Sequence, residues 1–368
     1  MKIQLLPQDL VREINVCQRA ISSRTTMPIL ECIRFEAKGK ECILRSSDLE
    51  LSIETRLRCQ VLEEGVTVIP ASVVGNIFRK LSSETAVLEA NEGKVTIDCA
   101  RSHFELQVPQ AEEFPAFPEL ETQEELVLPN DLVRHAVTET EFASSLDDSK
   151  IALTGIYFEK KADHVRFVAL DGYRLAVRKI PLEKSGEGSE LSVIIPKRAL
   201  SEWTRIIDDE ETRIRTVPGH ISFESGSIRM YSRLIDKQYI DYEEIISTEF
   251  STTVTLSRKE FQDALERASV MTREERANLV KLDFREGELL IQSNSETGNV
   301  RELVSIDRQG PDLKIAFNAK YLLDGVKALD CEKLLLYLNG MLNPMVMRPR
   351  EDEESYLYLV LPVRVARE

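Results

Sequence analysis

Residues 191–207, LSVIIPKRALSEWTRII, decide how we interpret the fold. Three consecutive apolar residues precede Pro196, and Leu200, Trp203 and Ile207 then recur at the spacing of one helix face. A short apolar run is typical of a buried strand, and a proline is common in the first turn of a helix. The stretch therefore predicts a strand that leads directly into an amphipathic helix.

The same strand–helix pattern occurs in two other places. Residues 66–81, VTVIPASVVGNIFRKL, carry a proline at the corresponding position, and residues 313–329, LKIAFNAKYLLDGVKAL, carry an asparagine there. Three similar strands hold Asp48, Asp171 and Asn294 at successive intervals of 123 residues, from 48 to 171 and from 171 to 294. This period is far longer than that of a solenoid repeat, so the sequence predicts three copies of one domain.

Each third also begins in the same way, at residues 5–11, 127–133 and 255–261, where a strand end leads into a helix. Alternating strands follow each helix, which makes every third a doubled βαβββ unit of the α+β class. A proline-rich and then acidic joint near residue 125, and a second joint near 249, predict the domain boundaries. The expected domains are residues 1–124, 125–248 and 249–368.

Composition excludes several classes of protein. No apolar run approaches the roughly 18 residues of a membrane span, and the N-terminal residues show no signal peptide, so we expect a cytoplasmic protein without a membrane partner. The six cysteines form no CxxC pair and no metal-ligand spacing, which predicts reduced thiols and no metal site. The net charge of −15 argues against simple electrostatic binding of nucleic acid.

The sequence offers no catalytic site and no cofactor motif. The four histidines are scattered, and no nucleophile elbow, phosphate loop or zinc-protease motif occurs. One alternative is an enzyme with a cryptic site among Asp171, Tyr173 and Arg174. It has little support, because Asp171 has counterparts in Asp48 and Asn294, and a residue that recurs in every repeat is expected to be structural.

Four short segments carry a family resemblance. They are RTTMPIL at residues 24–30, EFP at 113–115, DGYRLAV at 171–177 and LPVR at 361–364. In this order, on a threefold repeat, they resemble the DNA polymerase III beta subunits, the bacterial sliding clamps. The resemblance implies a head-to-tail homodimer, in which two helices per domain line a ring around double-stranded DNA, bound without regard to sequence. Such a ring tethers a polymerase by topology, so an acidic body is compatible with this function. The alternative is a clamp-fold interaction scaffold that does not encircle DNA.

The predicted helices differ in charge from the rest of the chain. Their combined charge is +3, which leaves −18 elsewhere. This contrast has the sign that a DNA-facing layer requires, although polar helix faces often carry lysine and arginine in any protein. The residues predicted from these helices to face DNA are Arg79, Lys80, Lys197, Arg198, Arg205 and Lys320. Arg24 is added by the resemblance alone.

The resemblance also implies a partner cleft between the second and third domains. In the family, short linear peptides of the polymerase, the clamp loader and repair proteins dock there through leucine and phenylalanine anchors. The matching positions are Leu153, Gly172, Tyr173, Arg174, Leu175, Ile240, Ile245, Leu359, Leu361, Pro362, Val363 and Arg364. The alternative for Leu153 and Ile245 is that they are simply part of an interdomain core.

The resemblance also implies a joint between the two subunits of the ring. Phe104 and Leu106 of one subunit are expected to contact Val270 and Met271 of the other.

The chain departs from the family pattern at positions that bear on peptide binding and on DNA contact. Leu170 replaces a threonine, Tyr173 a histidine and Ile240 a proline, while Asp147 stands in place of a glutamine that touches DNA. The tail reads Leu-Pro-Val-Arg-Val where Met-Pro-Met-Arg-Leu is familiar in the family, and the loss of two methionines makes the cleft stiffer. We therefore expect a shifted peptide preference.

Overall fold

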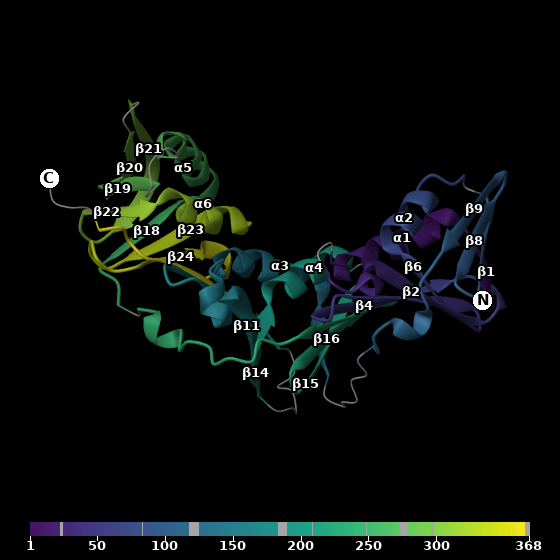
Figure 1. The fold of residues 1–368 in the computed structure, drawn as a ribbon. Coiled ribbons are helices and arrows are strands. Elements are labelled where there is room, and N and C mark those ends of the chain that lie inside the picture. Colours follow the sequence, from purple (N-terminus) through teal and green to yellow (C-terminus); the bar gives the residue numbers. More distant parts are fainter. Residues whose placement is uncertain are drawn as a thin grey trace. The chain divides into compact units, whose positions relative to one another are not determined.

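The computed structural model describes residues 1–22, 25–82, 84–117, 125–182, 190–207, 209–247, 249–272, 278–295 and 298–364. The chain divides into two compact units, which are described separately. Unit 1 comprises Met1–Val133 and Arg198–Leu234, and unit 2 comprises Arg134–Lys197 and Ile235–Glu368. Figure 1 shows the order of the elements by colour along the chain.

The described helices begin where the sequence predicts strand–helix transitions. They are α1 (Pro7–Cys17), α2 (Ala71–Phe78), α3 (Asn130–Thr140), α4 (Lys197–Ile206), α5 (Arg258–Thr272) and α6 (Ala319–Ala328). Pro196 and Pro70 are the last residues of their strands, so each proline lies just before the helix and not within its first turn. At the corresponding place Asn318 caps α6, because its side chain accepts from the N–H groups of Lys320 and Tyr321.

Unit 1 contains two antiparallel sheets. The first has the order β5 (Gln60–Glu63), β1 (Lys2–Leu5), β7 (Ala86–Asn91), β8 (Lys94–Cys99) and β9 (Ser102–Gln107). The second has the order β10 (Leu126–Pro129), β15 (Glu211–Val217), β16 (His220–Ser225), β17 (Ile228–Arg233), β4 (Leu51–Arg58), β3 (Glu41–Ser47), β2 (Cys32–Lys38) and β6 (Gly65–Pro70). The pairing of β17 with β4 joins the first third of the chain to the second.

Unit 2 contains one antiparallel sheet of twelve strands. Its order is β14 (Leu191–Pro196), β11 (Gly155–Lys160), β12 (His164–Leu170), β13 (Arg174–Pro181), β25 (Tyr356–Val360), β24 (Met345–Pro349), β23 (Lys333–Leu338), β18 (Thr252–Ser257), β21 (Gly298–Gln309), β20 (Glu288–Ser295), β19 (Leu279–Phe284) and β22 (Leu313–Asn318). The pairing of β13 with β25 joins the second third to the last.

The element order confirms the predicted repeat. Six βαβββ units follow one another along the described chain, and β5 is a single additional strand in the first third. The apolar stripes of the helices form the cores, as their 3.6-residue spacing requires. In unit 1, Leu10, Ile14 and Cys17 of α1 are fully buried in one cluster with Val74 and Phe78 of α2. Trp203 of α4 is also fully buried, and its Nε1–H donates to Thr212 Oγ1 at 3.0 Å.

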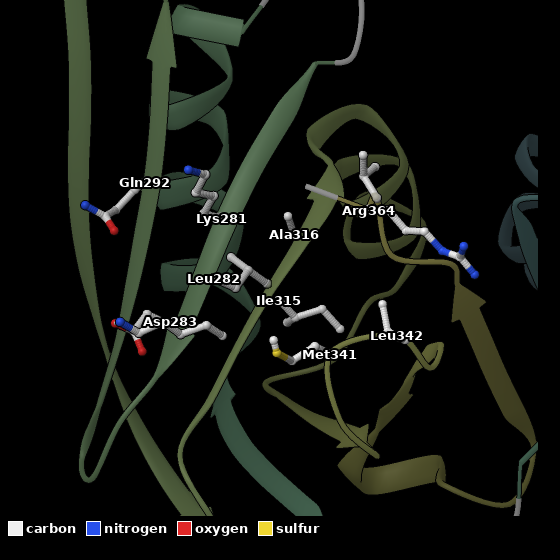
Figure 2. A pocket seen from close by; sticks show the side chains of 11 residues that line it. Lys281, Leu282, Asp283, Gln292, Ile315, Ala316, Met341, Leu342 and Arg364 are labelled. Carbon is white, nitrogen blue, oxygen red and sulfur yellow. The ribbon is translucent and has the colours of Figure 1, made fainter. Parts of the chain in front are cut away.

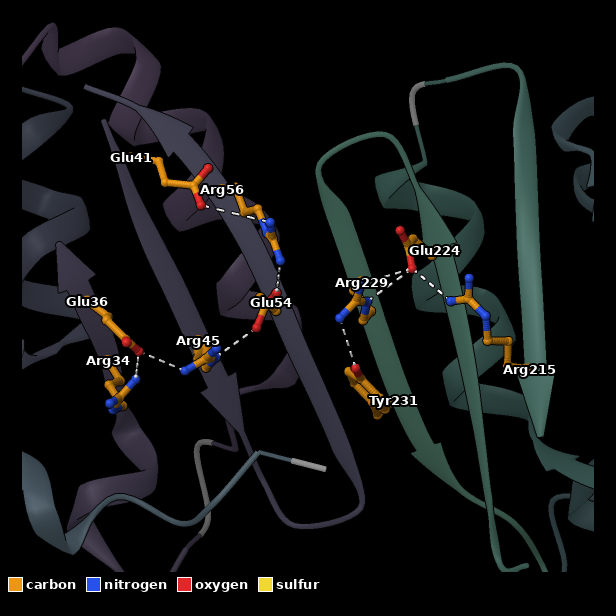
Figure 3. A network of polar contacts seen from close by, with 10 residues as sticks. All are labelled: Arg34, Glu36, Glu41, Arg45, Glu54, Arg56, Arg215, Glu224, Arg229 and Tyr231. Carbon is orange, nitrogen blue, oxygen red and sulfur yellow. Dashed lines mark hydrogen bonds and ion pairs between the residues drawn. The ribbon is translucent and has the colours of Figure 1, made fainter. Parts of the chain in front are cut away.

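Charged side chains lie on both sides of the β4–β17 joint, in one network on β2–β4 and another on β15–β17 (Figure 3). Arg45 and Arg229 lie opposite Glu54 on its two sides. Arg45 forms an ion pair with Glu54 at 2.8 Å and another with Glu36 at 2.9 Å, while Arg229 pairs with Glu224 at 3.0 Å. Partly exposed ion pairs contribute only about 0–1 kcal/mol each, so these two networks add little to the stability of the fold.

Candidate functional site

Arg174 at the start of β13 is the best-anchored residue among those predicted for the partner cleft. Its side chain is 8% exposed. Nε donates to Asp171 Oδ2 at 3.0 Å, Nη1 to Asp324 Oδ2 at 2.6 Å and Nη2 to the carbonyl of Phe142 at 2.7 Å. Burial acts to lower the pKa of Arg174, but its interactions with Tyr358, Asp324 and Asp171 outweigh burial and raise it. The arginine therefore ties the second third to α6 as a permanent cation.

Two stacked tyrosine rings lie beside this arginine. The Arg174 guanidinium lies 4.5 Å from the ring centroid of Tyr321, and that ring stacks on Tyr173 at 6.1 Å. Tyr358 Oη donates to the carbonyl of Tyr321 at 2.8 Å, which fixes this turn of α6. The sequence prediction missed Tyr321. The available signal was an apolar aromatic residue three positions after the Asn318 cap, beside the predicted Lys320.

The apolar residues predicted for the cleft fall into a buried set and an exposed set. Leu153, Leu175 and Leu359 are buried in one cluster, and Leu361 packs against it. The exposed residues are Tyr173, Ile240 and Ile245. Between the two isoleucines, Tyr242 is buried in the same cluster, so the linker places its aromatic ring inward. For Leu153 the burial agrees with the core alternative, whereas Ile245 is accessible.

Gly172 and the C-terminal tail shape the edge of this cluster. Gly172 has φ +97°, a conformation that favours glycine, and a Cβ there would lie 3.7 Å from Lys150 Nζ in ordinary contact. The backbone N–H of Leu361 donates to the carbonyl of Tyr173 at 2.8 Å. Beyond Pro362, the N–H of Val363 donates to the carbonyl of Ala316 at 2.8 Å. Val363 and Arg364 line a cavity of about 410 Å³, together with Ala316, Met341 and Leu342 (Figure 2).

The structure separates the predicted DNA-facing residues into engaged and available cations. Arg79 donates to Asn15, Gln18 and Asn76, Arg205 pairs with Glu202 at 3.0 Å, and Arg198 pairs with Asp48 at 2.5 Å. Within the described residues, Lys80, Lys197 and Lys320 have no ion pair, and Lys80 and Lys320 are exposed. Arg24 lies outside the described residues.

Asp147, which replaces the family's glutamine, has a local structural function. Its side chain caps the 3₁₀ turn that begins at Asp148, since Oδ1 accepts from the N–H of Ser149 at 3.0 Å. The hydrogen bonds from Ser149 lower the pKa of Asp147. An anionic cap at this place is therefore built into the fold of the loop.

The residues predicted for the ring joint lie at exposed edges. Phe104 and Leu106 are on β9, the last strand of the five-stranded sheet, and both are partly exposed. Val270 near the end of α5 is exposed and Met271 is partly exposed. Leu303 on β21 is 64% exposed, and sequence reasoning missed it. An apolar residue in a strand of otherwise polar alternation was the available signal.

The geometry provides no catalytic constellation around Asp171. Its Oδ1 accepts from the N–H groups of Tyr173 and Arg174 at 2.8 and 3.1 Å. Asp48 accepts from Glu50 and Leu51 in the same manner, at 3.1 and 2.8 Å. These aspartates are thus turn-forming residues of the repeat. Among the described residues, no group of three or more His, Cys, Asp or Glu is placed to hold a metal ion. No helix in the described ranges has the length and apolarity needed to span a bilayer.

Comparison with known proteins gives the same family over almost the entire chain. Three models of the DNA polymerase III beta subunit match in order, with the N-terminal domain at residues 1–118, the central domain at 127–241 and the C-terminal domain at 243–364. The prediction of three repeated clamp domains is thereby confirmed.

Relatives and solved structures agree with these matches. The beta sliding clamp of Staphylococcus epidermidis is 33% identical, with 96% of this chain and 97% of the relative covered. That of Staphylococcus aureus is 32% identical with the same coverage. The solved sliding clamp of Bacillus subtilis superposes with a TM-score of 0.96 at 30% identity over all of both chains. The beta subunit of Streptococcus pyogenes gives 0.96 at 27% identity, over 99% of this chain and 100% of that one. The chain belongs to the DNA polymerase III beta subunit family, the DNA sliding clamps, which are processivity factors of replication and not enzymes.

Proposed function

We propose that two copies of this chain join head to tail into a ring that encircles double-stranded DNA and tethers the replicative polymerase. The observation that carries the proposal is a pair of strand edges without a partner in the described chain. They are β9, the last strand of its sheet, and residues 298–305 of β21, which pair with β20 on one side, whereas residues 306–309 pair with β18. Along the chain, β4 pairs with β17 and β13 pairs with β25, both antiparallel. By the repeat, the third pair of this kind is β21 with β9. In the described chain neither strand has its partner, so the pair forms between two copies.

The repeat also specifies the register of the proposed joint. Ser52 lies opposite Tyr231, and Glu54 lies opposite Arg229. Ser52 lies opposite Ser47 on β3, and two 123-residue steps carry Ser47 to Ser293, which lies opposite Val300 because the third hairpin is two residues longer. The hairpins at Ser225–Ile228 and Cys99–Ser102 make Tyr231 equivalent to Glu105. We therefore propose Val300 opposite Glu105 of the partner. An exposed apolar surface at Val270 and Leu303 beside this edge supports the same joint, since Arg267 and Glu302 link α5 to β21 at 2.7 Å.

Native mass across a dilution series tests the ring. One chain weighs 41.9 kDa, so light scattering should give about 84 kDa, twice that value. A dimer that persists on dilution supports closure. A mass of 41.9 kDa at every concentration contradicts it and favours the alternative, a clamp-fold scaffold that does not encircle DNA.

We further propose that the cluster of Leu153, Leu175, Leu359 and Leu361, with its exposed rim, binds short linear peptides of the polymerase, the clamp loader and repair proteins. The support is the contrast between a buried apolar floor and the accessible Tyr173, Ile240 and Ile245, with Tyr321 added from the structure. The departures at Leu170, Tyr173 and Ile240 still predict an altered sequence preference.

Calorimetric titration with a peptide that carries leucine and phenylalanine anchors tests this cleft. Ile245→Asp should weaken binding by about tenfold or more, because a charge replaces an apolar contact. Leu62→Asp on β5 is the matched control, since Leu62 is similarly exposed but lies in unit 1. Equal affinity in wild type and Ile245→Asp would place the peptide elsewhere.

The proposed ring requires cations that face the DNA. Lys80, Lys197 and Lys320 are the proposed nonspecific phosphate contacts, with Arg79, Arg198 and Arg205 held by their protein partners until DNA competes for them. A cytoplasmic location and the domain limits 1–124, 125–248 and 249–368 stand as proposals beside them.

A further inference from the structure

The second linker, residues 235–247, carries both exposed isoleucines of the proposed cleft. Ile240 is 47% exposed and Ile245 is 40% exposed, whereas Tyr242 between them is buried. Residues 235–247 contain one short 3₁₀ turn, Glu243–Ile245, and no strand. Because no strand pairing fixes this segment, the contacts of its side chains decide where the two isoleucines lie.

Arg166 of β12 holds the middle of this linker on the sheet. Its Nη1 donates to Tyr242 Oη at 2.9 Å and to Glu243 Oε1. On β11, Glu159 lies opposite Arg166 in the ladder and accepts from the same nitrogen at 3.4 Å. The Arg166 side chain is only 22% exposed. One cation of the sheet thus contacts two consecutive linker residues, and we call Arg166, Tyr242 and Glu243 the linker clasp.

The charges of the clasp reinforce each other. Burial acts to lower the pKa of Arg166, but its interactions with Tyr242 and Glu243 outweigh burial and raise it. The hydrogen bond from Arg166 lowers the pKa of Glu243. Arg166 and Glu243 are therefore oppositely charged at neutral pH, and hydrogen bonds between charged groups are the stronger class.

Two linker tyrosines transmit this hold to the isoleucines. Tyr157 of β11 stacks on Tyr239 at 4.8 Å, and it lies edge-on to Tyr242 at 6.2 Å. Ile240 therefore follows one tyrosine that lies on the sheet and precedes another. The N–H of Ile245 donates to the carbonyl of Tyr242 at 3.2 Å, so the 3₁₀ turn ties the position of Ile245 to that of Tyr242.

Close packing does not support the linker on every side of the clasp. A cavity of about 210 Å³ borders it, lined by Arg166, Tyr242, Glu243, Ile246 and Leu357 among others. Where a segment borders a cavity, it lacks the dispersion contacts that would otherwise hold it. The polar contacts of Arg166 therefore contribute more to the placement of this linker than they would in a filled core.

The first linker has no equivalent hydroxyl. It carries Phe114 and Phe117 at the same three-residue spacing as Tyr239 and Tyr242. Arg45 lies over the ring of Phe117 at 5.4 Å. A phenylalanine ring offers an arginine no oxygen, so the tyrosine at the second joint adds a hydrogen bond where the isoleucines are exposed.

We propose that Arg166 is a positioning residue for peptide binding, which holds the second linker through Tyr242 and Glu243 so that Ile240 and Ile245 face the incoming peptide. The inference rests on the proposed cleft. Arg166 contacts the linker and not the peptide. Without it, the linker adopts several positions, and the apparent affinity falls by the fraction of time that it spends in the competent one.

Calorimetric titration of the full-length protein tests this role, with the capped peptide acetyl-Ser-Leu-Ser-Leu-Phe-amide as the probe. Arg166→Gln and Glu243→Gln should each weaken binding about fivefold. The double variant should also lose about fivefold and not about 25-fold, because both substitutions break one contact. Arg166→Lys keeps the charge toward Glu243 and should lose only about twofold.

Arg215→Gln is the matched control. Arg215 is 26% exposed, pairs with Glu125 and Glu224, and lies in unit 1, so its loss should leave the affinity unchanged. A native chain that does not bind the peptide refutes the cleft itself. Equal affinity in the native chain and Arg166→Gln, or a loss of about 25-fold in the double variant, overturns the positioning role alone.

Limited proteolysis examines the linker without any peptide. Lys237 is exposed and is the only lysine or arginine in residues 234–257. Mass spectrometry should show trypsin cleavage after Lys237 severalfold faster in Arg166→Gln than in the native chain or Arg215→Gln, because a released linker fits the protease. An unchanged rate at Lys237, or an equal increase at every cleavage site, overturns the proposal.

Discussion

At the scale of single residues, the buried charge of Arg174 positions the residues of the proposed cleft. Each guanidinium nitrogen of Arg174 already donates to the protein, to Asp171, Asp324 or the carbonyl of Phe142, and only 8% of the side chain is exposed, so little of it is accessible to a ligand. Its contribution to the proposed cleft is to position Tyr321, on whose ring it lies. The arginine that a motif marks as a contact residue thus acts here through its neighbours.

Arg174→Lys should lower the stability of unit 2 by about 2–3 kcal/mol. A lysine keeps the charge but cannot serve three acceptors in a fork geometry, so buried oxygen atoms lose their donors. Thermal unfolding followed by circular dichroism measures the effect. Arg205→Lys is the control, because its ion pair with Glu202 is exposed and should change stability by less than about 0.5 kcal/mol. Equal melting temperatures for the two variants would contradict the prediction.

Glu139 near the end of α3 is a second buried charge, and it makes stability depend on pH. Burial raises the pKa of Glu139 to about 7. The positive charge of Arg178 acts to lower this pKa, and the negative charge of Asp352 acts to raise it. Arg178 lies 3.4 Å from Glu139 but 2.6 Å from Asp352, and within the described residues Glu139 Oε2 has no hydrogen-bond partner. The folded protein therefore prefers the protonated acid.

The sign of this dependence follows from the raised pKa. The stabilisation is complete below the unfolded value of 4.5 and is lost as the pH rises through about 7. Between pH 5 and 8, Glu139→Gln should become more stable relative to the native chain by about 1–3 kcal/mol. Urea denaturation at both pH values measures the difference, and parallel pH profiles of variant and native chain would rule the assignment out.

At the scale of elements, the two linkers explain why one joint leaves apolar side chains exposed. In the first linker Phe114 is buried, and Phe117 packs edge-on against Tyr231 at 4.9 Å with Arg45 over its ring. In the second linker Tyr242 is buried, but Ile240 and Ile245 remain exposed. The first linker therefore covers its own joint, whereas the second leaves apolar surface for a partner.

Gly325 in α6 tests how closely this helix packs on β25. Alanine is normally the better helix residue by about 1 kcal/mol. Here a Cβ would lie 2.4 Å from the ring of Tyr358, whose hydroxyl is bound to the carbonyl of Tyr321. Gly325→Ala should therefore destabilise the protein by about 1–3 kcal/mol, measured by thermal unfolding.

Gly75 in α2 is the matched control for this substitution. A Cβ there meets the flexible ends of Arg79 and Gln18 at 3.0 Å, which can move aside. Gly75→Ala should be neutral or stabilising. If both alanine variants are more stable than the native chain, helix propensity outweighs the close contact between α6 and Tyr358, and the prediction is wrong.

The edge strand β9 carries the prediction for the ring joint. Leu106→Asp should give a folded monomer of 41.9 kDa in sedimentation, because an exposed charge on an edge strand opposes pairing. Leu62→Asp is placed on β5, the opposite edge strand of the same sheet, and should remain a dimer. A dimeric Leu106→Asp protein would mean that the joint lies elsewhere.

At the scale of the whole molecule, the charge distribution favours topological retention over adhesion. With a net charge of −15, the free protein should bind short duplex DNA weakly, and added salt should abolish that binding. Protein loaded on a closed DNA circle by a clamp loader should nevertheless withstand about 0.5 M salt, because a closed ring does not depend on phosphate contacts.

Cutting the circle provides the decisive measurement. Gel filtration should show the protein with the intact circle and free after linearisation, whereas Leu106→Asp should be free in both cases. Protein that dissociates from the intact circle at this salt concentration would show that it adheres by charge and is not linked to the DNA.

The repeat, the α+β class and the strand–helix transitions follow from the sequence alone. Residues 191–207 are sufficient for the transition at Pro196, because the periods of 2 and 3.6 residues are local properties of strands and helices. The 123-residue interval between Asp48, Asp171 and Asn294 likewise needs no coordinates, and the structure explains it through the turns formed by the two aspartates.

Only the tertiary structure brought the candidate sites together. Tyr321 stacks on Tyr173 across almost 150 residues of sequence. Leu303 is exposed on a part of β21 that pairs with β20 on one side only, and the N–H of Val363 donates to the carbonyl of Ala316. Hydrophobic patterning predicts which side chains are buried. It predicts neither which distant side chains they contact nor which strand edges remain unpaired. The sequence by itself therefore determined the repeated βαβββ elements of this protein. The packing of these elements determined which residues lie together on its surface.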